Sequence, residues 1–180
     1  MMNPGETELD EALVQRTRRG DAVALAALAT RYWNALHRIG WNMLSDPAAA
    51  GELAEATLLS ALRSTEAFPC NVPFRTALYR QAISQSLIRL HSAPSSATRS
   101  LAAETAFRGR DLGERIRETL QHLDALDRAA FLLREIEQFS REEAAVVLGI
   151  SPESVGRRTH RASVILTGFL GHLFERSLLS

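Results

Sequence analysis

Residues 140–166 constrain the fold of this chain more than any other part of its sequence. Ser140, with Glu143 three positions later, forms the pattern of a capping box, which opens a helix. Gly149 follows where a helix can end through a left-handed residue, and Ser151 is placed to cap a second helix. Two capped helices joined through a glycine turn are typical of a helix-turn-helix, a motif that reads the major groove of DNA.

Ordinary helical hairpins share this pattern, so the distribution of charge bears on the choice between the two interpretations. The acids Glu142 and Glu143 lie on the first predicted helix. The second predicted helix carries the sequence RRTHR at residues 157–161, and no acid follows Glu153 within the stretch. Because a phosphate backbone attracts segregated positive charge, this distribution favours DNA binding.

Composition limits the classes of function open to the chain. Its 180 residues are 46% hydrophobic, which is enough for one domain or two small ones with packed cores. All 21 basic residues are arginines, and 21 acids balance them to a net charge of zero. This balance argues against a protein that binds nucleic acid over its whole surface, so contacts with DNA would come from local basic faces.

The sequence offers no pattern for a metal, a cofactor or an active site. A single cysteine, Cys70, cannot form an internal disulfide or a multi-cysteine zinc site, and the five histidines lack ligand spacing. We find no Gly-rich phosphate loop and no set of nucleophile, base and oxyanion donor. The acidic N-terminus is unlike a signal peptide, and no apolar run could cross a bilayer. We therefore expect a cytoplasmic protein that is not an enzyme and does not insert in membranes.

Helical periodicity accounts for the first half of the chain. Apolar residues recur three or four positions apart in several segments that begin with capping residues. Thr7 and Asp10 form a candidate capping box, and Asp21 and Asp46 are candidate N-caps of later helices. The predicted helices cover residues 7–19, 22–43, 47–64 and 74–90.

The periodicity then stops in the polar, turn-rich sequence HSAPSSATRS. We interpret residues 92–111 as a flexible linker between two domains, residues 7–91 and residues 112–180. Helical spacing resumes at Ile116, continues over residues 129–138, and persists in the tail beyond the helix-turn-helix. The sequence thus predicts an all-α fold of two small helical domains joined by a flexible linker, with the helix-turn-helix in the second domain.

Four stretches, in order, carry a resemblance to a known family. They begin at Asp10 (DEALVQRTRRGDAVALAALATRYW), Ser45 (SDPAAAGELAEATLLSALRS), Val72 (VPFRTALYRQAISQSLIRL) and Leu132 (LLREIEQFSREEAAVVLGISPESVGRRTHRAS). They resemble, respectively, the opening helices, the polymerase-binding helix, the promoter-melting helix and the C-terminal domain of bacterial sigma factors of the extracytoplasmic-function (ECF) group. The fourth stretch is the most specific, and together the four span nearly the whole chain.

The resemblance implies a division of labour in transcription initiation. The N-terminal domain would bind core RNA polymerase and open the downstream (−10) promoter element. The C-terminal domain would read the upstream (−35) element, and the linker would thread along the polymerase. The polymerase would supply catalysis, and an anti-sigma protein would hold the chain inactive until a stimulus releases it.

The resemblance also implies roles for particular residues. An acidic and apolar face on residues 47–64 would bind the clamp helices of the polymerase; its members are Glu52, Glu55, Leu58, Leu59 and Arg63. In the N-terminal domain, the arginines Arg75, Arg80 and Arg89 would contact phosphates. The polar side chains of Ser84 and Gln85 would hydrogen-bond an unpaired base. In the helix-turn-helix, the expected DNA contacts are Ser151, Glu153, Ser154, Arg157 and Arg158, with His160 and Arg161 on the backbone.

The chain departs from the family pattern at several positions. Ser84 and Ile88 stand where the family usually has Asn and Asp, and Ala77 stands where it generally has Trp. Gly156 replaces a long polar or basic residue, and Thr159 replaces an expected Leu. The first three changes alter the surface that captures unpaired bases. Two alternatives therefore stay open: a sigma-like mimic that binds an anti-sigma protein without initiating transcription, and a stand-alone helix-turn-helix DNA-binding regulator.

Overall fold

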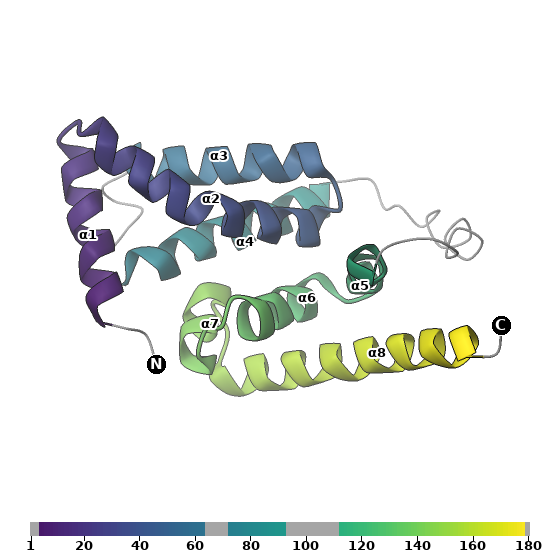
Figure 1. The fold of residues 1–180 in the computed structure, drawn as a ribbon. Helices are drawn as coiled ribbons and strands as arrows, with labels where there is room; N and C mark the ends of the chain where they lie inside the picture. Colours follow the sequence, from purple (N-terminus) through teal and green to yellow (C-terminus); the bar gives the residue numbers. More distant parts are fainter. Residues whose placement is uncertain (1–3, 64–71, 93–111, 179–180) are drawn as a thin grey trace.

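The protein is described here from a computed structural model that covers residues 4–63, 72–92 and 112–178, with side chains for 10–61, 72–92 and 113–169. All regular structure in these residues is helical, which confirms the predicted fold class. Two groups of helices lie on either side of residues 93–111 (Figure 1). The first group is α1 (Pro4–Arg18), α2 (Ala22–Leu44), α3 (Pro47–Arg63) and α4 (Phe74–Ser92). The second is α5 (Leu112–Gln121), α6 (Ala125–Phe131), the π-helical turn η1 (Leu132–Ile136), α7 (Arg141–Leu148) and α8 (Pro152–Leu178).

The capping residues of α2 and α3 are those predicted from the sequence. The Asp21 carboxylate accepts hydrogen bonds from the backbone N–H groups of Val23 (2.9 Å) and Ala24 (3.1 Å). The Asp46 carboxylate accepts from Ala48 (2.8 Å) and Ala49 (3.1 Å) in the same way. Each aspartate satisfies donors that the first helical turn leaves without partners, which fixes where the helix begins.

The predicted capping box of α1 is wrong. The helix begins at Pro4, so Thr7 lies within it rather than at its start. The Asp10 side chain is buried and accepts hydrogen bonds from Arg31 and the Tyr32 hydroxyl, both on α2. A carboxylate that satisfies donors of a neighbouring helix joins α1 to α2 instead of capping its own helix.

A close crossing of α2 and α3 depends on Gly40. A Cβ atom added at this position would lie 2.9 Å from the Cα atom of Ala50 and 3.0 Å from a methyl of Leu53. The helices can therefore approach this closely only with a glycine on α2. The apolar seam predicted for α2 is buried in the core, with Leu28, Leu36, Ile39 and Met43 fully buried.

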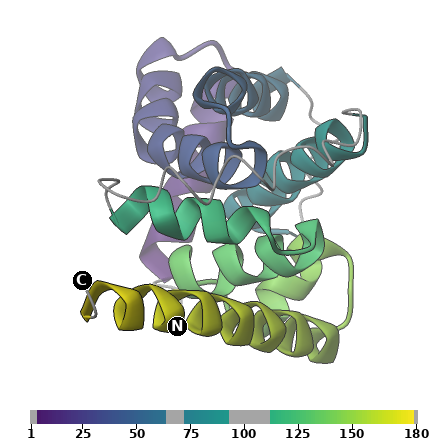
Figure 2. The same ribbon diagram turned by 90° about the vertical axis from the view of Figure 1, so that its right-hand side faces the viewer.

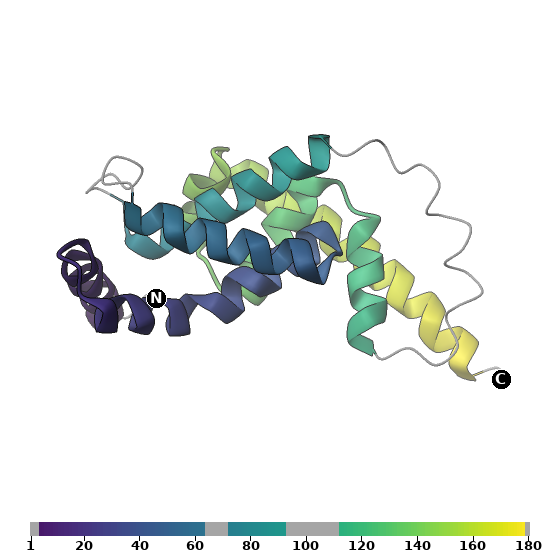
Figure 3. The ribbon, with the colours of Figure 1, turned by 90° about the horizontal axis from the view of Figure 1, so that it is seen from above.

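The second group of helices differs from expectation in one place. Residues 129–138 were predicted to be continuously helical, but α6 ends at Phe131 and the turn η1 follows it. The helical spacing expected in the tail belongs to the second helix of the motif, because α8 runs without a break for 27 residues. Figure 3 shows its C-terminal end projecting beyond the helices of the first group. None of the described helices is long and apolar enough to cross a membrane.

The two groups of helices pack on each other (Figures 1 and 2). The carboxylate of Glu137 lies at the centre of the contact, where it accepts hydrogen bonds from Arg38 on α2 (2.7 Å) and the Tyr79 hydroxyl on α4 (2.6 Å). Arg75 donates to the backbone carbonyl of Glu137 and lies over the Phe139 ring at 4.0 Å. Buried apolar side chains of both groups form one continuous core.

Arg128 on α6 supplies a second polar contact between the groups. Its guanidinium donates to the carbonyl of Met43 at the end of α2 (2.6 Å), to the Gln121 side chain (2.6 Å) and to the carbonyl of Leu123 (3.2 Å). Burial lowers the pKa of Arg128 to about 10, so the residue remains a cation at neutral pH. Gln121 in turn donates to the carbonyl of Asn42 at 2.8 Å. These contacts place α5 and α6 against the C-terminal half of α2.

Candidate nucleic-acid interface

The helix-turn-helix predicted from the sequence is confirmed by its caps. The backbone N–H of Glu143 donates to the Ser140 hydroxyl (3.1 Å), and the Ser140 N–H donates to the Glu143 carboxylate (2.7 Å). Gly149 ends α7 with φ of +67°, a left-handed conformation that glycine adopts without a Cβ penalty. The Ser151 hydroxyl then accepts from the N–H of Ser154 (3.3 Å) at the start of α8.

Helical spacing decides which side of α8 faces solvent. Val155, Ala162 and Leu166 are buried and form the inward stripe. Their spacing of seven and four residues keeps them on one face. The outward positions in the first three turns are Ser151, Glu153, Arg157, His160 and Arg161, all exposed. These five were among the expected DNA contacts.

The first two turns of α8 combine an acceptor with a donor. The pKa of the Glu153 carboxyl is lowered, mainly by hydrogen bonds with its own backbone N–H and the Ser151 side chain, and less by Arg157 and Arg141. Arg157 donates from Nη2 to the Ser154 hydroxyl (2.8 Å). A charged carboxylate can accept from the amino group of cytosine, and an arginine can donate to guanine or to phosphate. These two turns therefore carry the hydrogen-bonding groups that base-pair edges require.

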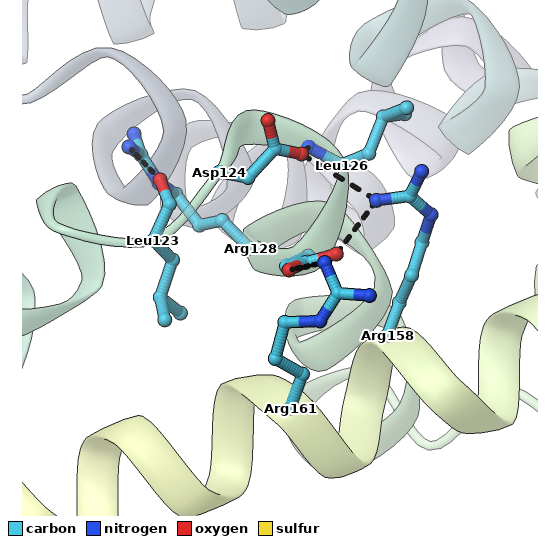
Figure 4. A network of polar contacts seen from close by, with 7 residues as sticks. Leu123, Asp124, Leu126, Arg128, Arg158 and Arg161 are labelled. Carbon is cyan, nitrogen blue, oxygen red and sulfur yellow. Dashed lines mark hydrogen bonds and ion pairs between the residues drawn. The ribbon is translucent and has the colours of Figure 1, made fainter.

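Two arginines of α8 reach back to α6 (Figure 4). Arg158 donates from Nη1 to the Asp127 carboxylate (2.6 Å) and lies 3.5 Å from Asp124. Arg161 lies 3.2 Å from the other oxygen of Asp127, whose side chain is only 2% exposed. Arg158 and Arg161, both expected to contact DNA, are thus paired with Asp127 in this structure. Asp127 was not among the residues predicted to be functional, although its position beside Arg128 in an otherwise apolar helical segment could have indicated a buried ion pair.

Helix α4 divides the expected DNA-contacting residues into two sets. Arg80 and Ser84 are exposed, and Gln85 is half-buried. Arg75 is engaged with the second group of helices through Glu137, and Arg89 donates to the carbonyl of Ala49 on α3 (3.0 Å). In this arrangement only the outer positions of α4 are open to a ligand.

The family departures on α4 fall on different sides of the helix. Ala77 is buried against the core. Ser84 is exposed, and Ile88, one turn further on, is 62% exposed. The outer face of α4 therefore presents an aliphatic side chain beside Ser84.

The departures on α8 have local consequences. A Cβ atom added at Gly156 would lie 3.6 Å from the guanidinium of Arg141, which is ordinary van der Waals contact. Thr159 has a buried hydroxyl oxygen without a hydrogen-bond partner among the described residues. A leucine at position 159 would bring no hydroxyl into this site.

Only some of the residues expected to bind the polymerase on α3 are exposed to solvent. Glu52, Glu55 and Leu59 are exposed, and they lie on adjacent turns of the helix. Leu58 points into the core with 5% of its surface exposed. Arg63 is the last residue of α3, and its side chain lies outside the described residues.

Comparison with known sequences places the helix-turn-helix in a described family. The family model of Sigma-70, region 4, matches residues 113–166. The chain is 26% identical over 179 residues to RNA polymerase sigma factor NccH of Alcaligenes xylosoxydans xylosoxydans, covering 92% of this chain and 96% of that one. It is 28% identical over 174 residues to the RNA polymerase sigma-H factor of Pseudomonas aeruginosa, covering 86% and 90%. It is 27% identical over 189 residues to the ECF RNA polymerase sigma-E factor of Salmonella typhimurium, covering 93% and 97%.

Solved structures share the fold. CnrH, in complex with the cytosolic domain of CnrY, superposes with a TM-score of 0.72 at 24% identity, covering 91% of this chain and 98% of that one. The sigma factor RpoE of Bartonella quintana, in complex with the anti-sigma factor NepR, superposes with a TM-score of 0.65 at 18% identity, covering 81% and 96%. Both likenesses extend over the two groups of helices.

Proposed function

The chain is a divergent member of the extracytoplasmic-function (ECF) group of bacterial RNA polymerase sigma factors, and from this premise we propose how its two groups of helices divide promoter recognition. It directs RNA polymerase to specific promoters at the start of transcription. The proposed N-terminal domain is residues 7–91, and the proposed C-terminal domain is residues 112–180. Residues 92–111 would connect them, although Ser92 itself completes α4.

The C-terminal domain reads the upstream promoter element through α8. One observation carries this proposal: a helix-turn-helix with both caps intact presents its outer residues to solvent at the start of the second helix. The contacts proposed are Ser151, Glu153, Ser154 and Arg157 for base edges, and His160 and Arg161 for the phosphate backbone. Arg158 is proposed below to act differently.

The N-terminal domain binds core polymerase and the downstream element. Glu52, Glu55 and Leu59 supply an exposed acidic and apolar surface on α3, with Arg63 at its end. Arg80, Ser84 and Gln85 supply the open face of α4 for phosphates and an unpaired base. Arg75 and Arg89 would join them only after leaving their present partners, the carbonyls of residues 137 and 49.

The partners follow from the same assignment. Core RNA polymerase and promoter DNA are the partners of a sigma factor. Because RpoE of B. quintana is seen with an anti-sigma factor, we include an anti-sigma protein among the partners of this chain. Catalysis of RNA synthesis belongs to the polymerase, so the chain itself is not an enzyme and acts in the cytoplasm with that machine.

Reconstituted transcription tests the proposal. Core polymerase with the full chain should produce RNA from a restricted set of starts in a genomic fragment pool, and core polymerase alone should not. Arg157→Gln should lower this yield, because it removes a proposed DNA contact. Arg19→Gln is the matched control, because Arg19 is an exposed arginine in the loop between α1 and α2. Equal yields from the two variants would remove Arg157 from the DNA face.

The sigma-like mimic is a second candidate, favoured by the outer face of α4. Ser84 and the exposed Ile88 offer less hydrogen-bonding capacity to an unpaired base than Asn and Asp would. A mimic would bind an anti-sigma protein without yielding promoter-specific RNA. The double variant Ser84→Asn, Ile88→Asp distinguishes the two: new strand opening, seen as permanganate-reactive thymines that the natural chain does not produce, would support the mimic. Strand opening by the natural chain would exclude it. A stand-alone regulator would fail to associate with core polymerase in a pull-down.

A further inference from the structure

Asp127 is a buried acid whose carboxylate is directed at the proposed DNA-binding helix. It lies on α6 with 2% of its side chain exposed, and both oxygens face arginines of α8. Arg158 approaches one oxygen to 2.6 Å, and Arg161 approaches the other to 3.2 Å. A buried carboxylate requires such partners, because leaving its charge without them is costly.

We infer that Asp127 is a positioning residue that selects which arginines of α8 are available to DNA. It holds Arg158 against α6 and thereby leaves Arg157 as the arginine open to base edges. The inference rests on the proposed function, because it assumes that the outer face of α8 meets duplex DNA. It adds to that function an intramolecular acid that limits the number of phosphate contacts.

The geometry of α8 explains why neighbouring arginines separate. Consecutive residues of an α-helix point about 100° apart. Arg157 therefore lies on the outer face, where its contact is the Ser154 hydroxyl one turn earlier. Arg158 lies on the flank beside the buried stripe, with 27% of its side chain exposed and within reach of α6. Asp124 adds a weaker contact at 3.5 Å and also caps α6 by accepting from the N–H of Leu126 (3.0 Å).

The consequence concerns specificity rather than affinity. An arginine released to the phosphate backbone increases attraction to every DNA sequence equally, because phosphates carry no sequence information. Asp127 retains Arg158 and competes with DNA for Arg161. The non-specific part of the binding free energy therefore stays small. The contacts of Glu153 and Arg157 with base edges then account for a larger share of the free energy of DNA binding.

The salt dependence of DNA binding measures this directly. The probe is a 30-base-pair duplex of random sequence, titrated with the full chain between 50 and 200 mM salt. The full chain is suitable because the outer face of α8 is exposed while the two groups of helices are packed together. Each added phosphate contact steepens log K against log salt by about 0.9. Over this fourfold range of salt, one released arginine therefore increases the loss of affinity about 3.5-fold, and two increase it about 12-fold.

Four variants separate the possible outcomes. Asp127→Asn should steepen the slope by one or two contacts and reduce discrimination between a selected duplex and the random one. The double variant Asp127→Asn, Arg158→Gln should lose the part of this steeper slope that the released Arg158 contributes. On the random duplex, which lacks the cognate bases, the exposed Arg157 would contact phosphate, so Arg157→Gln should flatten the slope of the natural chain by about one contact, whereas Arg158→Gln alone should leave it unchanged.

The controls distinguish a failed inference from a failed function. If Arg157→Gln leaves the slope unchanged, or the natural chain does not bind the duplex, the proposed DNA face is wrong and the inference falls with it. If Arg157→Gln flattens the slope but Arg158→Gln does so equally, Arg158 meets DNA and Asp127 does not withhold it. Should Asp127→Asn fail to fold, this comparison of Arg157→Gln with Arg158→Gln still decides the matter. A folded Asp127→Asn with a natural slope, checked by circular dichroism at the assay temperature, would leave Asp127 a purely structural role and overturn the inference.

Discussion

Replacing Glu137 by Gln should loosen the packing of the two groups of helices. The change exchanges one oxygen for an NH2 group and removes the charge, with almost no change in volume. In the native protein one carboxylate oxygen accepts from Nε and Nη2 of Arg38, both at 2.7 Å, and the other accepts from the Tyr79 hydroxyl at 2.6 Å. A glutamine has a single oxygen, so it cannot accept from both partners in the same geometry.

The expected magnitude follows from the environment of each partner. A hydrogen bond to a charged group contributes about 1.5–3 kcal/mol, against about 1 kcal/mol for a neutral one, so the loss is about 1–2 kcal/mol. The Glu137 side chain is 4% exposed, but that of Arg38 is 45% exposed. Water can therefore hydrate the guanidinium once it is released, which places the loss near 1 kcal/mol. The ratio of separated to packed molecules should rise about fivefold.

Distances between spin labels report the packing directly. Cysteines placed at the exposed positions Ala56 on α3 and Glu142 on α7, with Cys70 replaced by Ser, allow one label on each group of helices. Pulsed electron resonance on the Glu137→Gln variant should show a larger fraction of long distances than the natural chain.

Glu135→Gln is the matched control for this experiment. Glu135 lies in the same π-helical turn, and its side chain is exposed. If both variants give the same distance distribution and the same thermal midpoint as the natural chain, the Glu137 carboxylate does not hold the two groups together and the reasoning above is wrong.

Three further predictions concern stability. Gly156→Ala should raise stability by about 0.5–1 kcal/mol, because an interior glycine weakens a helix and the new methyl would make only ordinary contact with Arg141; a lower midpoint in urea unfolding would show that the contact is too tight. Burial, reinforced by nearby carboxylates, raises the pKa of Tyr32 and Tyr79 well above their ordinary value near 10. The contribution of these two tyrosines to the free energy of unfolding is therefore complete below pH 10. It declines as the pH rises above 10, by up to about 1.4 kcal/mol per pH unit for each tyrosine. Tyr79→Phe should make the alkaline slope of the unfolding free energy shallower, and an unchanged slope would contradict this. Asp46→Ala should cost about 1 kcal/mol by removing the N-cap of α3, measured by thermal unfolding against an Asn variant that retains the cap; equal midpoints for the two variants would contradict the capping role.

The features predicted correctly from the sequence depend on residues close together in the chain. The caps at Asp21, Asp46 and Ser140 act on N–H groups two or three positions away, so a short window contains both partners. The same is true of the turn at Gly149. Local spacing was therefore sufficient to place the helix-turn-helix and the starts of α2 and α3.

The features that escaped prediction depend on distant partners. Glu137 meets Arg38, 99 positions away, and Asp127 meets Arg158, 31 positions away. No periodic pattern identifies such pairs, because they form only after helices that lie far apart in the sequence have packed on each other. Asp10 was misassigned for the same reason: a three-residue spacing suggested a cap, while its actual partners lie on the next helix.

The uninterrupted length of α8 has a mechanical consequence. A helix of 27 residues measures about 40 Å, and its first turn is the part that would enter the groove. The first half of α8 is packed on α6 and α7 through Val155, Ala162 and Leu166, so a force on the far end moves the first turn together with these helices. A tilt of about 5° applied there would displace the first turn by roughly 3.5 Å, which is about one base-pair step of DNA. A protein that binds the far end of this helix would therefore shift the position of its first turn along the promoter without contacting a base.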